Sequence, residues 1–412
     1  MIPAVIQHAA RLLAAALCCA CMTSSIAAAA ATAADCGGLS RLDVNTPPGF
    51  CVGIVASGFK FPRGIQPLPN GDLLVVDMGG WEPDRGSVWR LKQAGVAYEK
   101  TLLLTGLDRP SGIALGPDGL VYIGAVKRIF RFDPARPAAT LRDVIGGASK
   151  VAPLPGLGRH LLTTMRFDPR GDLFVNVGSS SDHCESADGS VPAAQACREA
   201  EGKEPLGAIR RYSMAWPGGT VAGWESYARG LRNSMALAFQ PRSGVLWQGE
   251  NGRDSMQLAM PGLTNDEELP HDELNLIKHG ANYGWPYCYD ANLPSPEYPA
   301  WNCKRYQAPL RLLPAHAAPL GMTFYTATRF PALYRNSLLI GFHGYRRHGH
   351  RLVALLPDAG GAPLGKMVNL ISGWEHRGTQ PMGAPVDIQL GPDGNIYISE
   401  DRNGRVLRLQ YH

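Results

Sequence analysis

Six strand–turn–strand phrases recur along this chain, and they restrict its fold more than any other feature. They begin at Pro62, Pro110, Thr163, Asn233, Pro319 and Pro385. Each phrase joins two alternating apolar runs through a turn rich in glycine or asparagine, as in PSGIALGPDGLVYIGA. Glycine supplies the positive φ that a tight hairpin needs, so each phrase predicts one β-hairpin.

The spacing of the hairpins indicates how they assemble. They recur roughly every 45 to 90 residues, and a unit of this size cannot bury its own apolar face, so neighbouring units must stack. We therefore predict an all-β fold, a six-bladed β-propeller. A lone strand in PPGFCVGIVASGF, from Pro47, can pair with GRVLRLQY, from Gly404, and close the ring.

The N-terminus is typical of a secretory signal. Arg11 precedes an apolar stretch from Leu12 to Met22, and Ala31-Thr32-Ala33 fits the small-residue cleavage rule. Lipid anchoring at Cys21 is the disfavoured alternative, since the residues before it lack the usual aliphatic position. We expect residues 1–34 to be the signal peptide and residues 35–412 to be one propeller domain, periplasmic or secreted. No transmembrane segment is expected in that mature chain.

The cysteines agree with an oxidising compartment. Of nine cysteines, three precede residue 35, which leaves six in three neighbouring pairs: Cys36 with Cys51, Cys184 with Cys197, and Cys288 with Cys303. Six thiols allow fifteen connectivities. Sequential pairing is preferred because it closes short loops without crossing the propeller, and no CxxC spacing supports a zinc site.

The charge of the chain argues against a polyanionic partner. The net charge is +5 and only 18% of residues are charged, with Lys and Arg scattered rather than clustered. We therefore expect no nucleic-acid binding. The excess of positive charge is better explained by a small anionic ligand held by a few arginines.

Several phrases carry a resemblance to a known family. The order of YARGLRNSMALAFQP, GENGRDSM, DELNLIKHGANYGWP and PVDIQLGPDGNIYISED resembles the soluble glucose and sorbosone dehydrogenases, over nearly the whole mature chain. Members of that family are six-bladed propellers that use pyrroloquinoline quinone and calcium. The resemblance implies a quinoprotein that oxidises a sugar or aldehyde, passes hydride to the quinone, and gives the electrons to an external quinone or cytochrome.

The resemblance also implies catalytic residues. His160 follows a glycine-bounded loop and lies eight residues before the turn at Asp168, the offset of the family's catalytic base. An imidazole suits removal of a hydroxyl proton. Arg232 and Asn233 match the family's pair that contacts the quinone, where a permanent guanidinium charge would stabilise the reduced oxygen.

The remaining predicted site residues serve the metal and the quinone carboxylates. Gly252 and Arg253 match backbone calcium ligands, although Arg253 replaces a proline of the glucose dehydrogenases, and Asp272 and Glu273 match further carboxylate ligands. Either Arg346 or Arg347 would bind a quinone carboxylate.

Two departures from the family pattern concern the substrate. Ser179 stands where the glucose dehydrogenases have an acidic residue, and Arg159 replaces an acidic neighbour of His160. Preference is therefore expected to have moved away from glucose. Two other functions stay open: a calcium-dependent lactone hydrolase, and a non-catalytic propeller that binds glycans or proteins through its loops.

Overall fold

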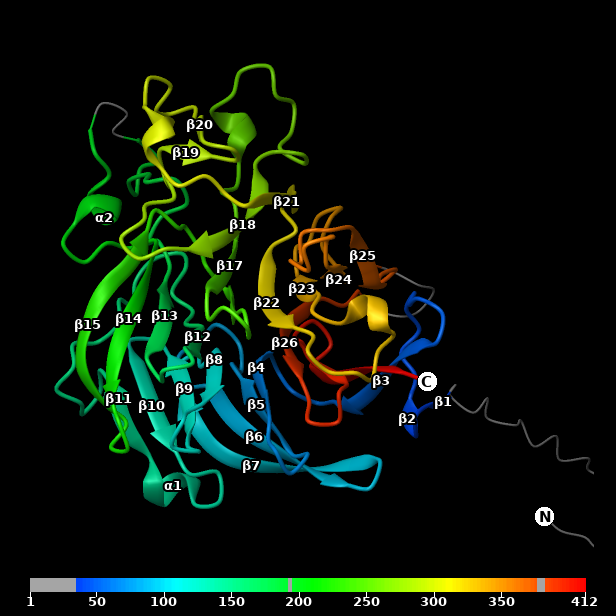
Figure 1. Ribbon diagram of the computed structural model, residues 1–412. Helices are drawn as coiled ribbons and strands as arrows, with labels where there is room; N and C mark the ends of the chain where they lie inside the picture. Colours follow the sequence, from blue (N-terminus) through cyan, green and yellow to red (C-terminus); the bar gives the residue numbers. More distant parts are fainter. Residues whose placement is uncertain (1–34, 192–194, 376–381) are drawn as a thin grey trace, which may run out of the picture. The chain divides into compact units, whose positions relative to one another are not determined.

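The computed structural model describes residues 35–191, 195–375 and 382–412. In this part of the chain, six four-stranded sheets form the blades of a propeller (Figure 1). The inner strands of successive blades contact one another in the closed order β4, β8, β12, β16, β22, β26 and back to β4. The predicted fold class is confirmed. The predicted signal peptide lies outside the described residues.

The first three blades are built from consecutive strands. Blade 1 contains β4 (Pro62–Pro67), β5 (Leu73–Asp77), β6 (Gly86–Ala94) and β7 (Ala97–Leu107). Blade 2 contains β8 (Gly112–Leu115), β9 (Val121–Ala125), β10 (Arg128–Phe132) and β11 (Arg142–Ile145), with the short helix α1 (Pro137–Thr140) before β11. Blade 3 contains β12 (Met165–Phe167), β13 (Leu173–Val177), β14 (Ala208–Ala215) and β15 (Thr220–Arg229).

The other three blades include the insertion-bearing blade and the closing blade. Blade 4 contains β16 (Ala236–Phe239), β17 (Leu246–Glu250), β18 (His271–Ile277) and β21 (Arg311–Ala315). Blade 5 contains β22 (Pro319–Phe324), β23 (Leu338–Phe342), β24 (Arg351–Leu355) and β25 (Met367–Ile371). Blade 6 contains β26 (Pro385–Leu390), β27 (Ile396–Glu400), β28 (Arg405–Tyr411) and the N-terminal β3 (Phe50–Ala56).

The hairpin turns form as their residues dictate. In the Pro-Asp-Gly turns of blades 2 and 6, Gly119 and Gly394 have φ of 74° and 77°. Asp118 Oδ1 accepts the Leu120 N–H at 3.1 Å, and Asp393 Oδ1 accepts the Asn395 N–H at 3.1 Å. Glycine and an aspartate side chain thus supply the positive φ and the local hydrogen bond that reverse the chain.

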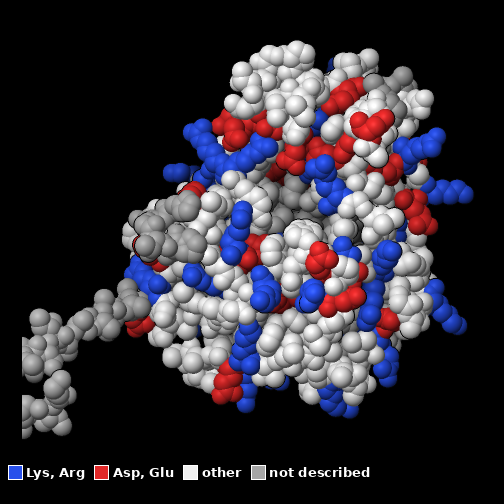
Figure 2. All heavy atoms as spheres, turned by 180° about the vertical axis from the view of Figure 1, so that it is seen from behind, with Lys and Arg blue, Asp and Glu red and all other residues white. Residues whose placement is uncertain are grey.

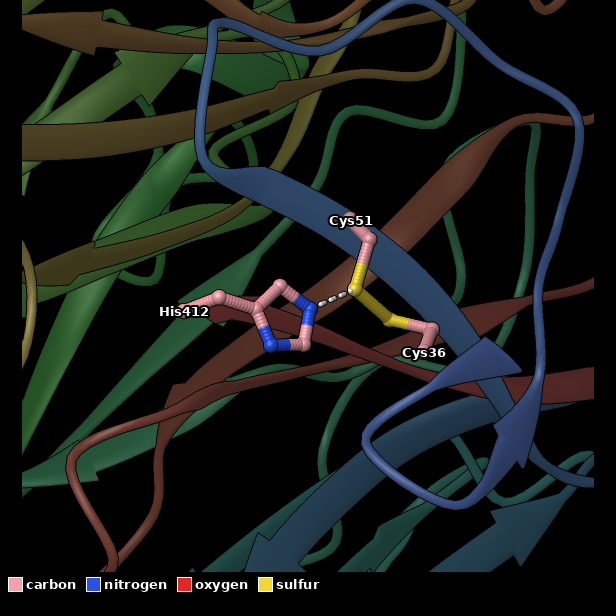
Figure 3. A group of neighbouring side chains, drawn as sticks. All are labelled: Cys36, Cys51 and His412. Atoms are coloured by element: carbon pink, nitrogen blue, oxygen red, sulfur yellow. Dashed lines mark hydrogen bonds between the residues drawn. A yellow bond between two sulfur atoms is a disulfide. The ribbon is translucent and has the colours of Figure 1, made fainter. Parts of the chain in front are cut away.

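The ends of the described chain meet in blade 6. β3 pairs with β28 in antiparallel register from Phe50↔Tyr411 to Ala56↔Val406, so the predicted closure by an N-terminal strand is confirmed. The Cys36–Cys51 disulfide ties the small β1–β2 hairpin (Asp35–Cys36 and Leu39–Ser40) to β3. His412 Nε2 lies 2.8 Å from Cys51 Sγ (Figure 3), so side-chain contacts also join the two chain ends.

Apolar side chains fill the spaces between blades. Between blades 1 and 2 the buried cluster includes Val76, Val88, Ile123 and Phe130, each with no exposed surface. A larger cluster joins blades 5 and 6 and includes Leu352, Ile388, Ile398 and Leu407. Burial of one such side chain contributes roughly 1.5–3 kcal/mol, so the ring provides a rigid frame for its loops.

The insertions of blades 3 and 4 carry the other two disulfides, Cys184–Cys197 and Cys288–Cys303. Their residues share one buried cluster that includes Cys197, Trp285, Tyr298 and Cys303, beside α2 (Arg198–Glu201) and the β19–β20 hairpin (Cys288–Tyr289 and Leu293–Pro294). Single 3-10 turns lie at Met256–Leu258, Cys303–Arg305 and Ala332–Tyr334. All three predicted disulfides are thus confirmed, and two of them brace loops that pack together.

The surface carries charges of both signs. Figure 2 shows Lys and Arg side chains mixed with Asp and Glu over one face, as the scattered sequence pattern predicts. Among the described residues, no helix has the length and apolar character needed to cross a membrane.

Candidate active site

Two adjoining cavities lie where loops from several blades converge. The first, of about 250 Å³, is the polar cavity, lined by His160, Arg232, Asn233, Asn251, Gly252, Asp254, Asp272, His316, Ala318, His343, Gly344, Tyr345 and Arg346. The second, of about 340 Å³, is the aromatic cavity, lined by Phe61, Arg63, Trp81, Arg159, His160, Leu162, Asn233, Met235, Leu320, His343 and Tyr345. His160, Asn233, His343 and Tyr345 line both cavities, so these residues form their boundary.

His160 is held by the loop that follows β13. Its backbone N–H donates to Ser179 O at 3.2 Å, and its ring Nδ1 lies 2.9 Å from Ser179 Oγ. Ser179 Oγ itself donates to Ser181 O at 2.6 Å, so it accepts a hydrogen bond from His160 Nδ1–H. This assigns the tautomer and leaves Nε2 with a free lone pair.

The surroundings of His160 keep its ring neutral. Burial, reinforced by the positive charge of Arg232, lowers the pKa of His160 to about 3. Nε2 has no hydrogen-bond partner among the described residues. The ring therefore presents an unprotonated nitrogen at neutral pH, which is the form a general base requires.

Arg232 is the centre of a buried polar network. Its guanidinium pairs with the Asp182 carboxylate, and it also donates to Asp182 O at 3.1 Å and Gly252 O at 2.8 Å. Only 5% of its side chain is exposed. Burial would raise the pKa of Asp182, but hydrogen bonding from His183 and the charge of Arg232 hold that pKa below its usual range. The pair is therefore a fixed ion pair.

Asn233 is positioned through its backbone rather than its side chain. Its N–H donates to Glu250 Oε1 at 2.7 Å. Glu250 also accepts from Ser234 Oγ at 3.0 Å, and burial raises the pKa of Glu250 to about 7. The Asn233 amide makes no side-chain hydrogen bond with the described residues, so both its donor and its acceptor are available at the boundary of the two cavities.

The four predicted calcium residues lie close together in the chain but face different spaces. Gly252 lines the polar cavity and also a small adjoining cavity of about 40 Å³, which Arg253 and Glu273 line as well. Asp272 lines the polar cavity instead. Asp272 and Glu273 are neighbours on β18, where successive side chains point to opposite faces.

The hydrogen bonds of these residues differ too. Asp272 accepts the Gly252 N–H at 2.7 Å and the Ala318 N–H at 2.6 Å, so both of its oxygens brace backbone. The Arg253 guanidinium pairs with Glu297 at 2.5 Å. Within the described part of the chain Glu273 accepts only from Asn275 Nδ2, at 3.2 Å, and burial raises the pKa of Glu273 well above its ordinary value. Of the two carboxylates, Glu273 keeps more coordination capacity for a cation.

The two candidate arginines of blade 5 are clearly separated. Arg346 lines the polar cavity, where its Nη1 lies 2.5 Å from Asp266 Oδ1. Arg347 pairs with Glu268 at 3.0 Å, and 75% of its side chain is exposed. Arg346 is therefore the arginine that can reach a ligand in the polar cavity.

Two further residues of the polar cavity, His316 and His343, were not predicted from the sequence. His316 Nε2 lies 2.7 Å from Asp266 O, which makes it a donor. His343 Nε2 lies 2.9 Å from Asp401 Oδ1, and Asp401 in turn pairs with Arg63 at 2.9 Å. Burial lowers the pKa of His343. Nothing local in the sequence marks Asp401 or Arg63 as partners of His343.

Comparison with known proteins places the chain in a family. A model of the TrAA12-like family matches residues 44–412. A pyrroloquinoline quinone-dependent pyranose dehydrogenase from Coprinopsis cinerea is 25% identical over 90% of this chain and 55% of its own length. A pyrroloquinoline quinone-dependent sugar dehydrogenase from Hypocrea jecorina is 26% identical over 57% of this chain and 55% of its own length. The chain thus spans about half the length of these two relatives.

Solved structures agree with the fold. A calcium-containing structure of a Trichoderma reesei AA12 enzyme superposes with a TM-score of 0.69 at 20% identity, covering 91% of this chain and 98% of the other. The holo form of the PQQ domain of a Coprinopsis cinerea pyranose dehydrogenase gives a TM-score of 0.68 at 20% identity, covering 91% of this chain and 99% of the other. At this identity the likeness concerns the fold alone.

Proposed function

Because this chain belongs to the TrAA12-like family, we propose that it is a quinoprotein that oxidises a sugar or aldehyde with pyrroloquinoline quinone. The predicted family and enzyme class agree with the names of its relatives. The observation that carries the proposal is the unprotonated Nε2 of His160 at the boundary between a polar and an aromatic cavity. One cavity suits a charged cofactor and the other suits a sugar.

The polar cavity has groups that fit the quinone. Arg232 and Arg346 bring permanent positive charge to a cofactor that carries three carboxylates, and Asn233 offers an amide with free hydrogen-bonding capacity. Guanidinium groups are well suited to carboxylates. Asn233 and Arg346 would therefore contact the cofactor. The N–H groups of Arg232 already donate to Asp182, Asn251, Gly252 and Asp254, so Arg232 would act on the cofactor through its charge. Arg347, which lies outside the cavity, would contribute little.

Oxygen atoms beside this cavity fit a calcium ion. Asn251 Oδ1 is buried without a hydrogen-bond partner in the described chain. Asn251 and Gly252 both line the polar and the small cavity. The small cavity, of about 40 Å³, also contains Glu250, Glu273 and Asp290. A hard cation prefers such oxygen ligands. We therefore assign the calcium ligands to the backbone carbonyls of Gly252 and Arg253 and the carboxylate of Glu273. Asp272 would hold the backbone at Gly252 and Ala318 in place.

The protein's own groups can perform the proton chemistry. His160 Nε2 would accept the proton of the substrate hydroxyl, while Ser179 fixes the ring through Nδ1. When bound, the quinone would supply the two-electron acceptor for the hydride that leaves the carbon bearing that hydroxyl. Arg232, held rigid by Asp182 and by backbone carbonyls, stabilises negative charge that forms in the polar cavity without further reorganisation.

The remaining parts of the proposal concern location and partners. Residues 1–34 would direct the protein to the periplasm or outside, and residues 35–412 would be the catalytic domain. Three disulfides support an oxidising compartment. The electrons would then pass to an external quinone or cytochrome.

The direct test is a screen of aldoses and aldehydes with an artificial dye as electron acceptor, with and without added quinone and calcium. Oxidation that requires both additions is expected. Calcium-dependent lactone hydrolysis without quinone-dependent oxidation would favour the hydrolase alternative. Binding of glycans without either reaction would favour a non-catalytic propeller.

A further inference from the structure

We infer that the aromatic cavity is a second sugar subsite, which binds a pyranose ring next to the one at His160, so that the ligand is an oligosaccharide chain end. Trp81 is 57% exposed and Tyr345 is 56% exposed. Among the described residues they are the only exposed tryptophan and the only exposed tyrosine. Both line the aromatic cavity together with His160.

The two aromatic side chains come from blades 1 and 5, and each ring contacts a neighbouring side chain. Trp81 follows β5 of blade 1, and its ring packs edge-to-face on Phe61 at a centroid distance of 6.2 Å. Tyr345 follows β23 of blade 5, and the Arg402 guanidinium lies 3.8 Å from the centre of its ring. The Tyr345 ring also contacts the rings of His343 and His350, and both aromatic side chains keep more than half of their surface exposed.

The rest of the wall is part apolar and part polar, since Arg63, Arg159, His160, Asn233 and His343 line it beside three aliphatic side chains. Leu162, Met235 and Leu320 also line this cavity. Contiguous exposed apolar surface often marks a binding site. Here it gathers at one opening, which also holds the proposed base, so a shared ligand explains its position.

The chemistry of this wall selects the ligand class. A pyranose with equatorial hydroxyls presents a flat face of axial C–H groups, which packs on an electron-rich aromatic face, while its hydroxyls stay in water. Wide exposure at the opening suits a ring whose chain continues into solvent. We therefore assign the subsite to a pyranose ring of an oligosaccharide. The assignment of the reacting sugar to His160 rests on the proposed function, whereas binding at Trp81 does not.

Binding of cellotriitol to the purified protein tests the subsite directly, since this reduced trisaccharide has no free hemiacetal carbon to oxidise. Titration calorimetry should show that Trp81→Ala weakens binding about tenfold, as expected for loss of one aromatic stack. Trp81→Phe should restore most of the affinity. Leu258→Ala is the matched control, because Leu258 is 82% exposed and lines neither cavity. Unchanged cellotriitol affinity in Trp81→Ala would overturn the inference.

Kinetics add an independent arm. The ratio of kcat/KM for cellotriose to kcat/KM for glucose should fall about tenfold in Trp81→Ala. If Trp81→Ala instead raises KM for the electron acceptor and leaves this ratio unchanged, the aromatic surface binds the acceptor and the inference fails. If the wild-type protein oxidises no sugar, the proposed function fails while the cellotriitol titration still decides the subsite.

Discussion

The polar and aromatic cavities share four residues but are built on opposite principles. In the polar cavity each strong charge already has a partner: Arg232 pairs with Asp182, and Arg346 pairs with Asp266. In the aromatic cavity Trp81 and Tyr345 expose more than half of their surface. Paired buried charges hold atoms in fixed positions, whereas exposed rings offer contact area. The polar cavity should therefore control rate and cofactor binding, and the aromatic cavity should control substrate affinity.

His160 belongs to both cavities, so its substitution should have the largest effect. His160→Gln should lower turnover by on the order of 10² to 10⁴ as expected for a lost general base. The propeller should stay folded and bind quinone, because a loop side chain contributes little to the blade cores. Steady-state oxidation of the best sugar, with quinone occupancy read from absorbance, gives the answer. Retention of more than about a third of wild-type turnover at full occupancy would reject the role.

Arg232→Ala should have the next largest effect, and this effect should be confined to the functions of the polar cavity. We expect a fall in turnover of about 10² to 10³ together with weaker quinone binding, because the charge that serves both is lost. The variant also leaves Asp182 without its cation, so the melting temperature should fall. Arg232→Lys is the control that keeps the charge. Its cofactor affinity should lie between those of the other two proteins. Equal quinone affinity in all three proteins would place Arg232 outside the cofactor site.

The pH dependence of kcat/KM should reveal how Ser179 affects the protonation of His160. Only the neutral ring of His160 can take a proton, and its pKa is lowered to about 3, so kcat/KM should not fall as pH drops from about 8 to 5. Ser179→Asp places a carboxylate beside Nδ1, which raises the pKa of His160. An acid limb should then appear, with a loss of about twofold to tenfold near pH 5 relative to pH 8. An acid limb near 6.5 in the wild-type protein would contradict the assigned environment.

The smallest effect should separate two neighbouring arginines. Arg346→Ala should weaken quinone binding about fivefold, since it removes one charge-assisted contact from a half-buried site. Arg347→Ala should change it by less than twofold, because exposed ion pairs contribute little. Equilibrium titration of the quinone into both variants makes the comparison. Equal losses would indicate a general charge effect rather than a contact of Arg346.

The sequence predicts the frame of this protein better than its site because the two depend on interactions of different range. Turns such as the one at Gly119 follow from local chemistry, and the closing strand follows from the open edge of the last blade. The sequential disulfides follow from loop length. His160, Arg232 and Asn233 were identified through short phrases, and the structure brings all three to one cavity.

The remaining site features depend on long-range contacts. The partner of Arg232 is Asp182, 50 residues earlier, and the partner of His343 is Asp401, 58 residues later. No local pattern selects such pairs. The separation of Asp272 from Glu273 could have been predicted, because adjacent residues on a strand face opposite sides. The inward position of Arg346 depends on Asp266 in another insertion, so adjacent arginines could not be distinguished.

The most direct test of the account is a single-turnover measurement without external acceptor. Wild-type protein loaded with quinone and calcium is mixed anaerobically with excess sugar, and the absorbance of the bound quinone is followed in parallel with the His160→Gln variant. The account predicts rapid reduction in the wild-type protein and reduction slower by at least about 10² in the variant at equal occupancy. Reduction at similar rates in both proteins would show that His160 does not take the substrate proton, and the central claim would fail.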